Sequence, residues 1–258
     1  MTGKGNDFQF PRRIVLQGAI AAGGAAILSG GAAHAAEGAE VTSISLKQNG
    51  VVLFQGDSIT DAGRNKEQLG PNDLSAWGFG YAMMAASAIL GAHARLTLQC
   101  YNRGISGNKV PDLAARWQAE TIDLNPAVLS ILIGVNDLWH KKSGKYDGTV
   151  EQYESGYAEL LNQTKAALPD VILVVCEPFV LRCGAIDSSW FPEFDDRRAA
   201  AKRVADNVGA IWVPFQSMFD AAVSEATPPE YWAKDGVHPS VAGHALMART
   251  WLETTGLG

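Results

Sequence analysis

Five short apolar runs, rich in β-branched residues, recur along the chain and are separated by longer segments with mixed polarity. We expect strands at residues 51–55, 95–101, 127–133, 171–176 and 210–213. The third and fourth runs, "AVLSILI" and "VILVVC", are almost continuously apolar. Such a pattern is typical of strands that are buried on both faces of a parallel sheet.

The segments between these runs show helical spacing of apolar positions, and we expect helices at about residues 81–91, 110–122, 149–168, 195–208 and 241–253. The third of these has the clearest signals. Thr149 and Gln152 form a capping box at its start, and Pro169 ends it. One face of this helix carries Tyr153, Tyr157, Leu160, Leu161 and Leu168. The alternation of strands and helices predicts an α/β fold, a single-domain, doubly wound parallel five-stranded sheet with right-handed crossovers.

The first 35 residues have the character of an export signal. Arg12 and Arg13 precede a run of small and apolar residues, and Ala33-His34-Ala35 fits a small-residue cleavage site. The paired arginines favour the twin-arginine route. The alternative is an uncleaved membrane anchor, although the run is weakly hydrophobic for a span. We therefore expect a signal at residues 1–35, a globular domain at residues 36–258, and an exported protein that is periplasmic or secreted.

Charge and cysteine content exclude several classes of protein. The formal net charge is −6, and removal of residues 1–35, with three basic groups and one acidic group, brings it to −8. An acidic chain without a basic tract is not expected to bind nucleic acid or to associate stably with anionic membranes. No zinc-binding motif is present, and we expect no metal and no cofactor. Three cysteines are too few for a disulfide scaffold, but Cys176 and Cys183 are either a pair or two inert thiols.

Glycine and polar residues follow the first three predicted strands, at residues 56–58, 102–108 and 134–137. In a parallel sheet these segments share one edge, where ligands bind. Ser58 is then either part of a simple turn or a nucleophile, and a nucleophilic serine needs a base. His238 is the best candidate, because Asp235 lies three residues before it and can orient its imidazole. The alternative for Asp235 and His238 is an ordinary surface turn.

Acyl transfer also needs donors for the developing oxyanion. The Ser58 N–H, the Gly107 N–H and the Asn136 side chain come from three neighbouring strand ends, and each such donor is typically worth ~3 kcal/mol. Gly107 allows close approach of the backbone, since it has no Cβ. A positive-φ turn at Gly107 and a helix cap at Asn136 are the simpler interpretations.

Four blocks, "GDSIT", "GISGN", "GVND" and "DGVHP", occur in this order and resemble those of the GDSL, or SGNH, hydrolases. The resemblance implies a flavodoxin-like three-layer sandwich. It places the family's serine on Ser58, its glycine on Gly107, its asparagine on Asn136, and its aspartate and histidine on Asp235 and His238. Together with "NRGISGNKVPDLAARW" and "DGVHPSVAGHALMARTWL", the blocks look like the acetyl-xylan esterase branch. The implied function is hydrolysis of acetyl esters, with an acetylated carbohydrate as the substrate and xylan as one candidate.

Weaker expectations concern residues around this edge. Trp139 and Trp232 are candidate sugar-binding side chains, and Trp190 is a weaker candidate. Burial in the core is the simpler interpretation of each. Asp61 and Arg64 are candidate substrate-binding residues beside the serine, or else a surface ion pair. The sequence leaves open whether the protein is a homo-oligomer.

Three other functions fit part of the pattern. A lysophospholipase or thioesterase would use the same machinery with a long acyl chain. A phosphoryl-transfer site would gather Asp57, Asp61, Asp137 and Asp235 around a metal, although no P-loop is present. A non-catalytic carbohydrate-binding protein would keep the fold alone.

Overall fold

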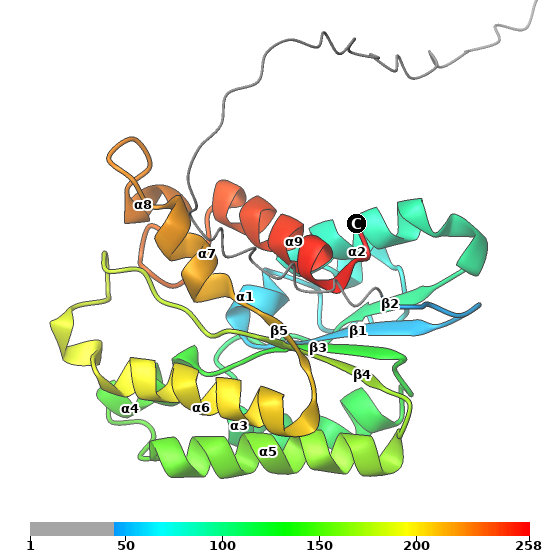
Figure 1. Cartoon of the computed structure of the whole chain (residues 1–258), viewed down its shortest axis with the longest axis horizontal. Coiled ribbons are helices and arrows are strands. Elements are labelled where there is room, and N and C mark those ends of the chain that lie inside the picture. Colours follow the sequence, from blue (N-terminus) through cyan, green and yellow to red (C-terminus); the bar gives the residue numbers. More distant parts are fainter. Residues whose placement is uncertain (1–43) are drawn as a thin grey trace, which may run out of the picture. The chain divides into compact units, whose positions relative to one another are not determined.

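Five parallel strands form the sheet of residues 44–258, which are the part of the chain that the computed structural model describes. Their spatial order is β2–β1–β3–β4–β5, so β2 lies on one side of β1, and β3, β4 and β5 follow on the other side (Figure 1). The strands are β1 (Val51–Gly56), β2 (Gln99–Asn102), β3 (Val128–Leu132), β4 (Ile172–Cys176) and β5 (Ile211–Val213). This topology confirms the predicted doubly wound α/β fold. The predicted signal at residues 1–35 lies outside the described residues.

Helices cover both faces of the sheet. They are α1 (Ser58–Asp61), α2 (Tyr81–Ala92), α3 (Val110–Trp117), α4 (Val135–Lys142), α5 (Val150–Ala167), α6 (Glu193–Val208), α7 (Phe215–Ala222), α8 (Pro229–Trp232) and α9 (Val241–Thr255). Short helical turns also occur at η1 (Leu74–Ala76), η2 (Ala94–Leu96), η3 (Gln118–Ile122) and η4 (Ser188–Trp190).

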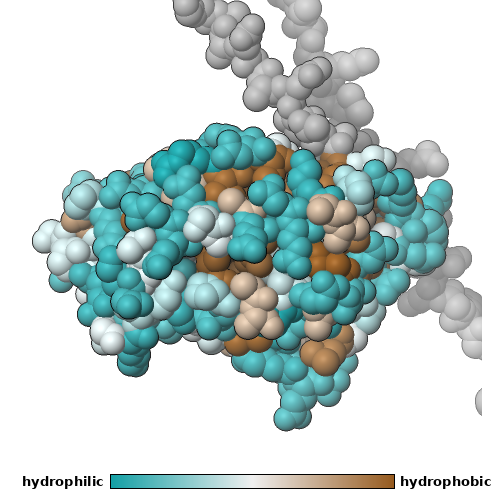
Figure 2. Space-filling view, turned by 90° about the horizontal axis from the view of Figure 1, so that it is seen from below, coloured by the Kyte–Doolittle hydropathy of each residue, from teal (hydrophilic) through white to brown (hydrophobic). Residues whose placement is uncertain are grey.

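The buried residues fall into two cores, one on each side of the sheet. One core joins alternate strand residues to α2, α7 and α9, and the other joins the remaining strand residues to α3, α5 and α6. The resulting helix–sheet–helix sandwich is visible in Figure 1. On the face covered by α3, α5 and α6, the surface is mostly hydrophilic, with several hydrophobic patches between the hydrophilic residues (Figure 2). Each sheet face is thus covered, as a continuously apolar strand such as β3 requires.

Most predicted elements form where the periodicity places them. The capping box of α5 is present, with the Thr149 N–H donating to Gln152 Oε1 at 2.9 Å and the Gln152 N–H donating to Thr149 Oγ1 at 3.2 Å. Tyr153 and Tyr157 are fully buried on the predicted face. These local signals explain why α5 is long and regular.

The second strand is shorter than expected and starts later. The first residues of the predicted strand at 95–101 belong to η2 instead, and β2 begins at Gln99. Thr97 adopts a left-handed conformation with φ 47°, which an extended strand does not allow. The turn at this residue therefore separates η2 from β2.

The three cysteines are free and buried, so Cys176 and Cys183 do not form the disulfide that the sequence left open. Cys176 lies in the fourth strand with its Sγ 3.6 Å from Ser130 Oγ, whereas the Cys183 thiol donates to the Ala233 carbonyl at 3.2 Å. Burial raises the pKa of the Cys176 thiol to about 12, so the thiol is unreactive at neutral pH.

Within residues 44–258, none of the helices combines the length and the apolar character that a bilayer span requires.

Candidate active site

Ser58 is the first residue of α1 and lies directly beyond the carboxyl end of β1. The turn between them depends on Gly56, whose φ is +156° and where a Cβ would collide with the Leu132 carbonyl. Asp57 then caps the helix, because its Oδ1 accepts the Ile59 N–H at 3.0 Å. This turn holds Ser58 at the edge of the sheet, while Asp57 itself is buried.

His238 and Asp235 lie on the loop between α8 and α9 and reach Ser58 across the edge. The His238 Nε2 atom is 3.0 Å from Ser58 Oγ, and the His238 Nδ1 atom is 2.6 Å from Asp235 Oδ2. The other oxygen of Asp235 accepts the N–H groups of Val237 and His238 at 3.0 and 2.8 Å. Partial burial alone would raise the pKa of Asp235, but these bonds and the His238 side chain hold it below its ordinary value. Asp235 is therefore an anion that orients the imidazole.

Such a chain of three side chains is able to activate the serine. A neutral imidazole takes the hydroxyl proton, and the carboxylate stabilises the imidazolium that forms. His238 and Asp235 are both open to solvent, with side chains that are 48% and 42% exposed. The loop that carries Asp235 and His238 thus leaves these two side chains accessible to a substrate.

The expected oxyanion donors lie at the ends of neighbouring strands. Gly107 follows β2 with φ +84°, and a Cβ at this position would meet only the His140 ring, at 3.8 Å. The Asn136 side chain, on the first turn of α4, donates to the Asn108 carbonyl at 3.2 Å, which leaves its second N–H available. No described residue accepts a hydrogen bond from the Ser58 or Gly107 N–H. The edge of the sheet that carries Ser58 therefore also carries backbone and amide donors.

Of the expected aromatic residues, Trp139 lies next to the catalytic candidates. Its ring centroid is 6.1 Å from that of His238, and it packs edge-on against the buried Trp190 at 5.7 Å. Trp190 is 2% exposed and supports Trp139 from behind. These two residues form an aromatic wall beside the histidine.

Trp232, the second candidate sugar-binding side chain, is half-buried and has contacts of a structural kind. Its indole N–H donates to the Ala222 carbonyl at 3.2 Å, and its ring lies against Phe219 of α7. The side chain therefore holds α8 against α7, although its sequence neighbour Asp235 is only three residues away.

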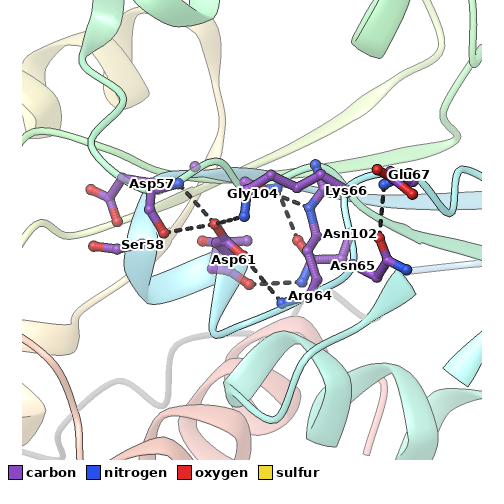
Figure 3. Close-up of polar contacts among 12 residues, drawn as sticks. Asp57, Ser58, Asp61, Arg64, Asn65, Lys66, Glu67, Asn102 and Gly104 are labelled. Atoms are coloured by element: carbon purple, nitrogen blue, oxygen red, sulfur yellow. Dashed lines mark hydrogen bonds and ion pairs between the residues drawn. The ribbon is translucent and has the colours of Figure 1, made fainter. Parts of the chain in front are cut away.

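Asp61 and Arg64 are also placed differently from substrate-binding residues, since a binding side chain must reach the solvent. Asp61 is 0% exposed and Arg64 is 5% exposed. Arg64 donates its Nε–H to the Gly104 carbonyl at 2.7 Å, beneath the loop that leads to Gly107 (Figure 3). Both residues support the site from behind.

The aspartates of the phosphoryl-transfer alternative do not gather around one point. Within residues 44–258, no three His, Cys, Asp or Glu side chains are arranged as metal ligands. Asp57 and Asp137 are buried, Asp61 is paired with Lys66 at 2.8 Å, and Asp235 is engaged by His238.

Two supporting residues have partners that the sequence did not identify, although a packing role for His244 on the last helix was expected. His244 of α9 accepts the Tyr81 N–H at 3.1 Å and thereby joins α9 to α2. Burial lowers the pKa of His244 to about 4, with the nearby His238 acting in the same direction. Burial also raises the pKa of Asp137 to about 6, and its Oδ1 accepts the Val110 N–H at 3.2 Å. A histidine or aspartate that is buried by a distant segment leaves no signal in the local sequence.

Comparison with known proteins agrees with this geometry. The model of the GDSL-like lipase/acylhydrolase family matches residues 54–246, which include both Ser58 and His238. The chain belongs to this family. As a GDSL-family member it is a hydrolase of the esterase class.

Proteins similar to this GDSL-family chain include an esterase of known name and several solved structures. An acetylxylan esterase of Geobacillus stearothermophilus is 33% identical over 212 residues, which cover 80% of this chain and 93% of that protein. A candidate GDSL-like lipase of Parabacteroides merdae is 49% identical with a TM-score of 0.81, covering 84% of this chain and all of that one. The crystal structure of Axe2, an acetylxylan esterase of Geobacillus stearothermophilus, has a TM-score of 0.73 at 32% identity and covers 83% of this chain and 97% of that one. Two Axe2 structures are described as catalytic mutants, in which a serine or an aspartate is replaced by alanine.

Proposed function

We propose that this GDSL hydrolase is a serine esterase that removes acetyl groups from carbohydrate, with xylan or xylo-oligosaccharides as the first candidates. The observation that carries the catalytic part is the hydrogen-bonded series Ser58 Oγ, His238 and Asp235, with separations of 3.0 and 2.6 Å. The acetyl and carbohydrate parts are supported by the acetylxylan esterase to which the chain is similar.

In the proposed reaction, Ser58 Oγ attacks the acetyl carbonyl while His238 Nε2 takes the hydroxyl proton. The oxyanion that forms is stabilised by the N–H groups of Ser58 and Gly107 and by the Asn136 amide. The bond to the sugar oxygen then breaks, His238 gives its proton to this departing oxygen, which leaves as a sugar hydroxyl, and the acetyl group stays on Ser58. Water attacks this acetyl-enzyme with His238 as the base, and acetate leaves as Ser58 regains its proton.

The aromatic wall supports a sugar as the alcohol part of the ester. Trp139 is half-buried and lies beside His238, the residue that would give its proton to the leaving sugar oxygen. An indole face packs well against the C–H face of a pyranose ring. We assign Trp139 to this contact and Trp190 to its support.

A second candidate is a longer-chain acyl esterase or thioesterase, and one observation favours it. Leu74 and Phe79 are 78% and 71% exposed, and the Phe79 ring lies over Gly63, just beyond α1. Exposed apolar side chains are able to hold an acyl chain. The nature of the acyl group therefore has to be measured.

The deciding experiment is acetate release from acetylated xylan, acetylated pectin, acetylated chitin oligomers and simple sugar acetates. We expect release from acetylated xylan or its oligomers by the wild-type protein and none by Ser58→Ala. No release from any carbohydrate, together with rapid cleavage of long-chain esters, would contradict the carbohydrate assignment.

The proposed substrate is a polysaccharide, which agrees with the export that we infer from residues 1–35. Fractionation of expressing cells, followed by N-terminal sequencing, tests this. We expect a processed chain that begins near Ala36 outside the cytoplasm. An unprocessed chain in the membrane fraction would support the anchor alternative.

A further inference from the structure

A charged carboxylate is buried beneath the loop that carries Gly107. Asp61 is 0% exposed, yet each of its oxygens is engaged. Its Oδ2 accepts the Ser106 N–H at 2.9 Å and the Ser106 hydroxyl at 2.7 Å, and it lies 2.8 Å from Lys66 Nζ. Its Oδ1 accepts the Arg64 N–H at 3.2 Å. Figure 3 shows Asp61 at the centre of these contacts, between the serine turn and the Gly104 loop.

This arrangement keeps the carboxylate ionised. Burial alone would raise the pKa of Asp61, but the bonds from Lys66 and Ser106 lower it below its ordinary value. A buried charge is costly unless it is paired and hydrogen-bonded, and here all of these partners lie within two short segments. The desolvation cost of this carboxylate is offset only while the two segments keep the same distance and orientation.

The two segments are the ones that carry the proposed nucleophile and an oxyanion donor. Asp61 is the last residue of α1, which begins at Ser58, and Ser106 directly precedes Gly107. Further bonds join the same segments. The Asn102 amide donates to the Thr60 carbonyl at 2.7 Å and accepts the Gly104 N–H at 2.9 Å. A Cβ at Gly104 would collide with the Asp61 N–H, so the loop lies directly on the helix.

We propose that Asp61 is a positioning residue, which acts through Ser106 to set the Gly107 N–H at the correct distance and angle from Ser58 Oγ. This inference rests on the proposed serine-esterase function and goes beyond it by assigning a role to a residue that does not touch substrate. A misplaced oxyanion donor stabilises the transition state less but leaves ground-state binding unchanged. Loss of an entire donor costs about 10²–10³-fold in kcat, and its displacement costs less.

The test uses p-nitrophenyl acetate as the probe and compares three variants with the wild type. Asp61→Asn keeps the size of the side chain but removes its charge. Ser106→Ala keeps the carboxylate and the backbone bond and loses only the hydroxyl bond. Asp73→Asn is the matched control, because Asp73 makes the same pair of bonds to Ser75, at 2.9 Å to the N–H and 2.7 Å to the hydroxyl, on the exposed turn η1.

We expect Asp61→Asn to lower kcat by roughly 10–100-fold with KM within about threefold of wild type, and Ser106→Ala to lower kcat by roughly 3–10-fold. Asp73→Asn should leave both constants unchanged. The rate at which a fluorophosphonate labels Ser58 should fall in parallel with kcat, since its phosphoryl oxygen occupies the same donors. A purely structural role would lower the melting temperature but not these rates in the folded protein.

Two results separate failure of this inference from failure of the proposed function. A wild-type protein that does not hydrolyse p-nitrophenyl acetate overturns the proposed function, and the role of Asp61 with it. An active wild type with an unchanged kcat in folded Asp61→Asn overturns only the role of Asp61. If Asp61→Asn does not fold, Ser106→Ala decides, and a kcat within twofold of wild type overturns the proposal.

Discussion

Ser58 and its two partners make the sharpest prediction at the scale of single residues. Replacing Ser58 by alanine should lower kcat/KM for acetyl esters by about 10⁴–10⁶-fold and leave the melting temperature nearly unchanged. Asp235→Asn should also lose most of its turnover, because the tautomer of His238 that it favours presents an N–H to Ser58. Both are measured with p-nitrophenyl acetate on purified protein. Retention of more than a tenth of the wild-type kcat/KM by Ser58→Ala would show that another group is the nucleophile.

Asp57, directly before the serine, predicts a pH-dependent stability. Burial raises its pKa to about 7, and the nearby Asp137 acts in the same direction. Between pH 3.8 and 7 the unfolded chain has lost this proton and the folded chain retains it, so the contribution of Asp57 to stability falls as the pH rises through this window. Asp57→Asn keeps the bond to the Ile59 N–H and removes the buried charge.

We therefore expect Asp57→Asn to be more stable than wild type at pH 8, by on the order of 2 kcal/mol, with the difference vanishing toward pH 4. Urea unfolding at both pH values measures this. The control is Asp73→Asn, which alters an exposed helix cap and should show no stabilisation at pH 8. A constant difference between the two pH values would contradict a titrating Asp57.

At the scale of elements, the hydrogen bond from the Tyr81 N–H of α2 to His244 of α9 predicts a contribution to stability that rises with pH, opposite to that of Asp57. The unfolded chain protonates His244 near pH 6.5, whereas the folded chain does so only near pH 4. The contribution of His244 is thus fully present above pH 6.5 and is lost as the pH falls toward 4. At pH 5 the expected loss is about 1–2 kcal/mol, and His244→Gln, whose amide oxygen is able to accept the same N–H, should lack it.

Urea unfolding of His244→Gln at pH 7 and pH 5 is the measurement, with His93→Gln at the cap of α2 as the control. Relative to His244→Gln, the wild type and His93→Gln should each become less stable by about 1–2 kcal/mol when the pH falls from 7 to 5, because the contribution of Asp57 is common to all three proteins. Equal losses in all three proteins would show that the α2–α9 contact does not depend on a neutral histidine.

At the scale of the whole molecule, the acyl preference distinguishes a carbohydrate esterase from a lipase-like enzyme. The site is formed by short loops at one edge of the sheet, and a closed acyl site between Ser58, Gly107 and Asn136 rejects each added methylene at ~1–3 kcal/mol. An open apolar groove would instead gain about 0.8 kcal/mol for each buried CH₂. We expect kcat/KM for p-nitrophenyl acetate to exceed that for the butyrate by roughly tenfold or more. Rates that climb steadily from acetyl to octanoyl would favour the exposed side chains of Leu74 and Phe79 as parts of an acyl-binding surface.

The sequence by itself determined the order of the elements and the edge at which the site lies. Strand and helix periods differ, and continuously apolar runs such as residues 171–176 can only be buried between two layers. Once the sheet is parallel, the segments after β1, β2 and β3 must meet at one edge. This rule is sufficient to bring Ser58, Gly107 and Asn136 to the same edge.

The tertiary structure alone decided how the side chains of that edge are used. Asp61 and Ser106 are 45 residues apart, and no local pattern shows that they share a hydrogen bond beneath the loop. Trp139 and Trp232 are equally close in sequence to catalytic candidates, yet only Trp139 lies beside His238. The physical reason is that periodicity records whether a residue faces the core, whereas the partner it meets there depends on how distant segments pack.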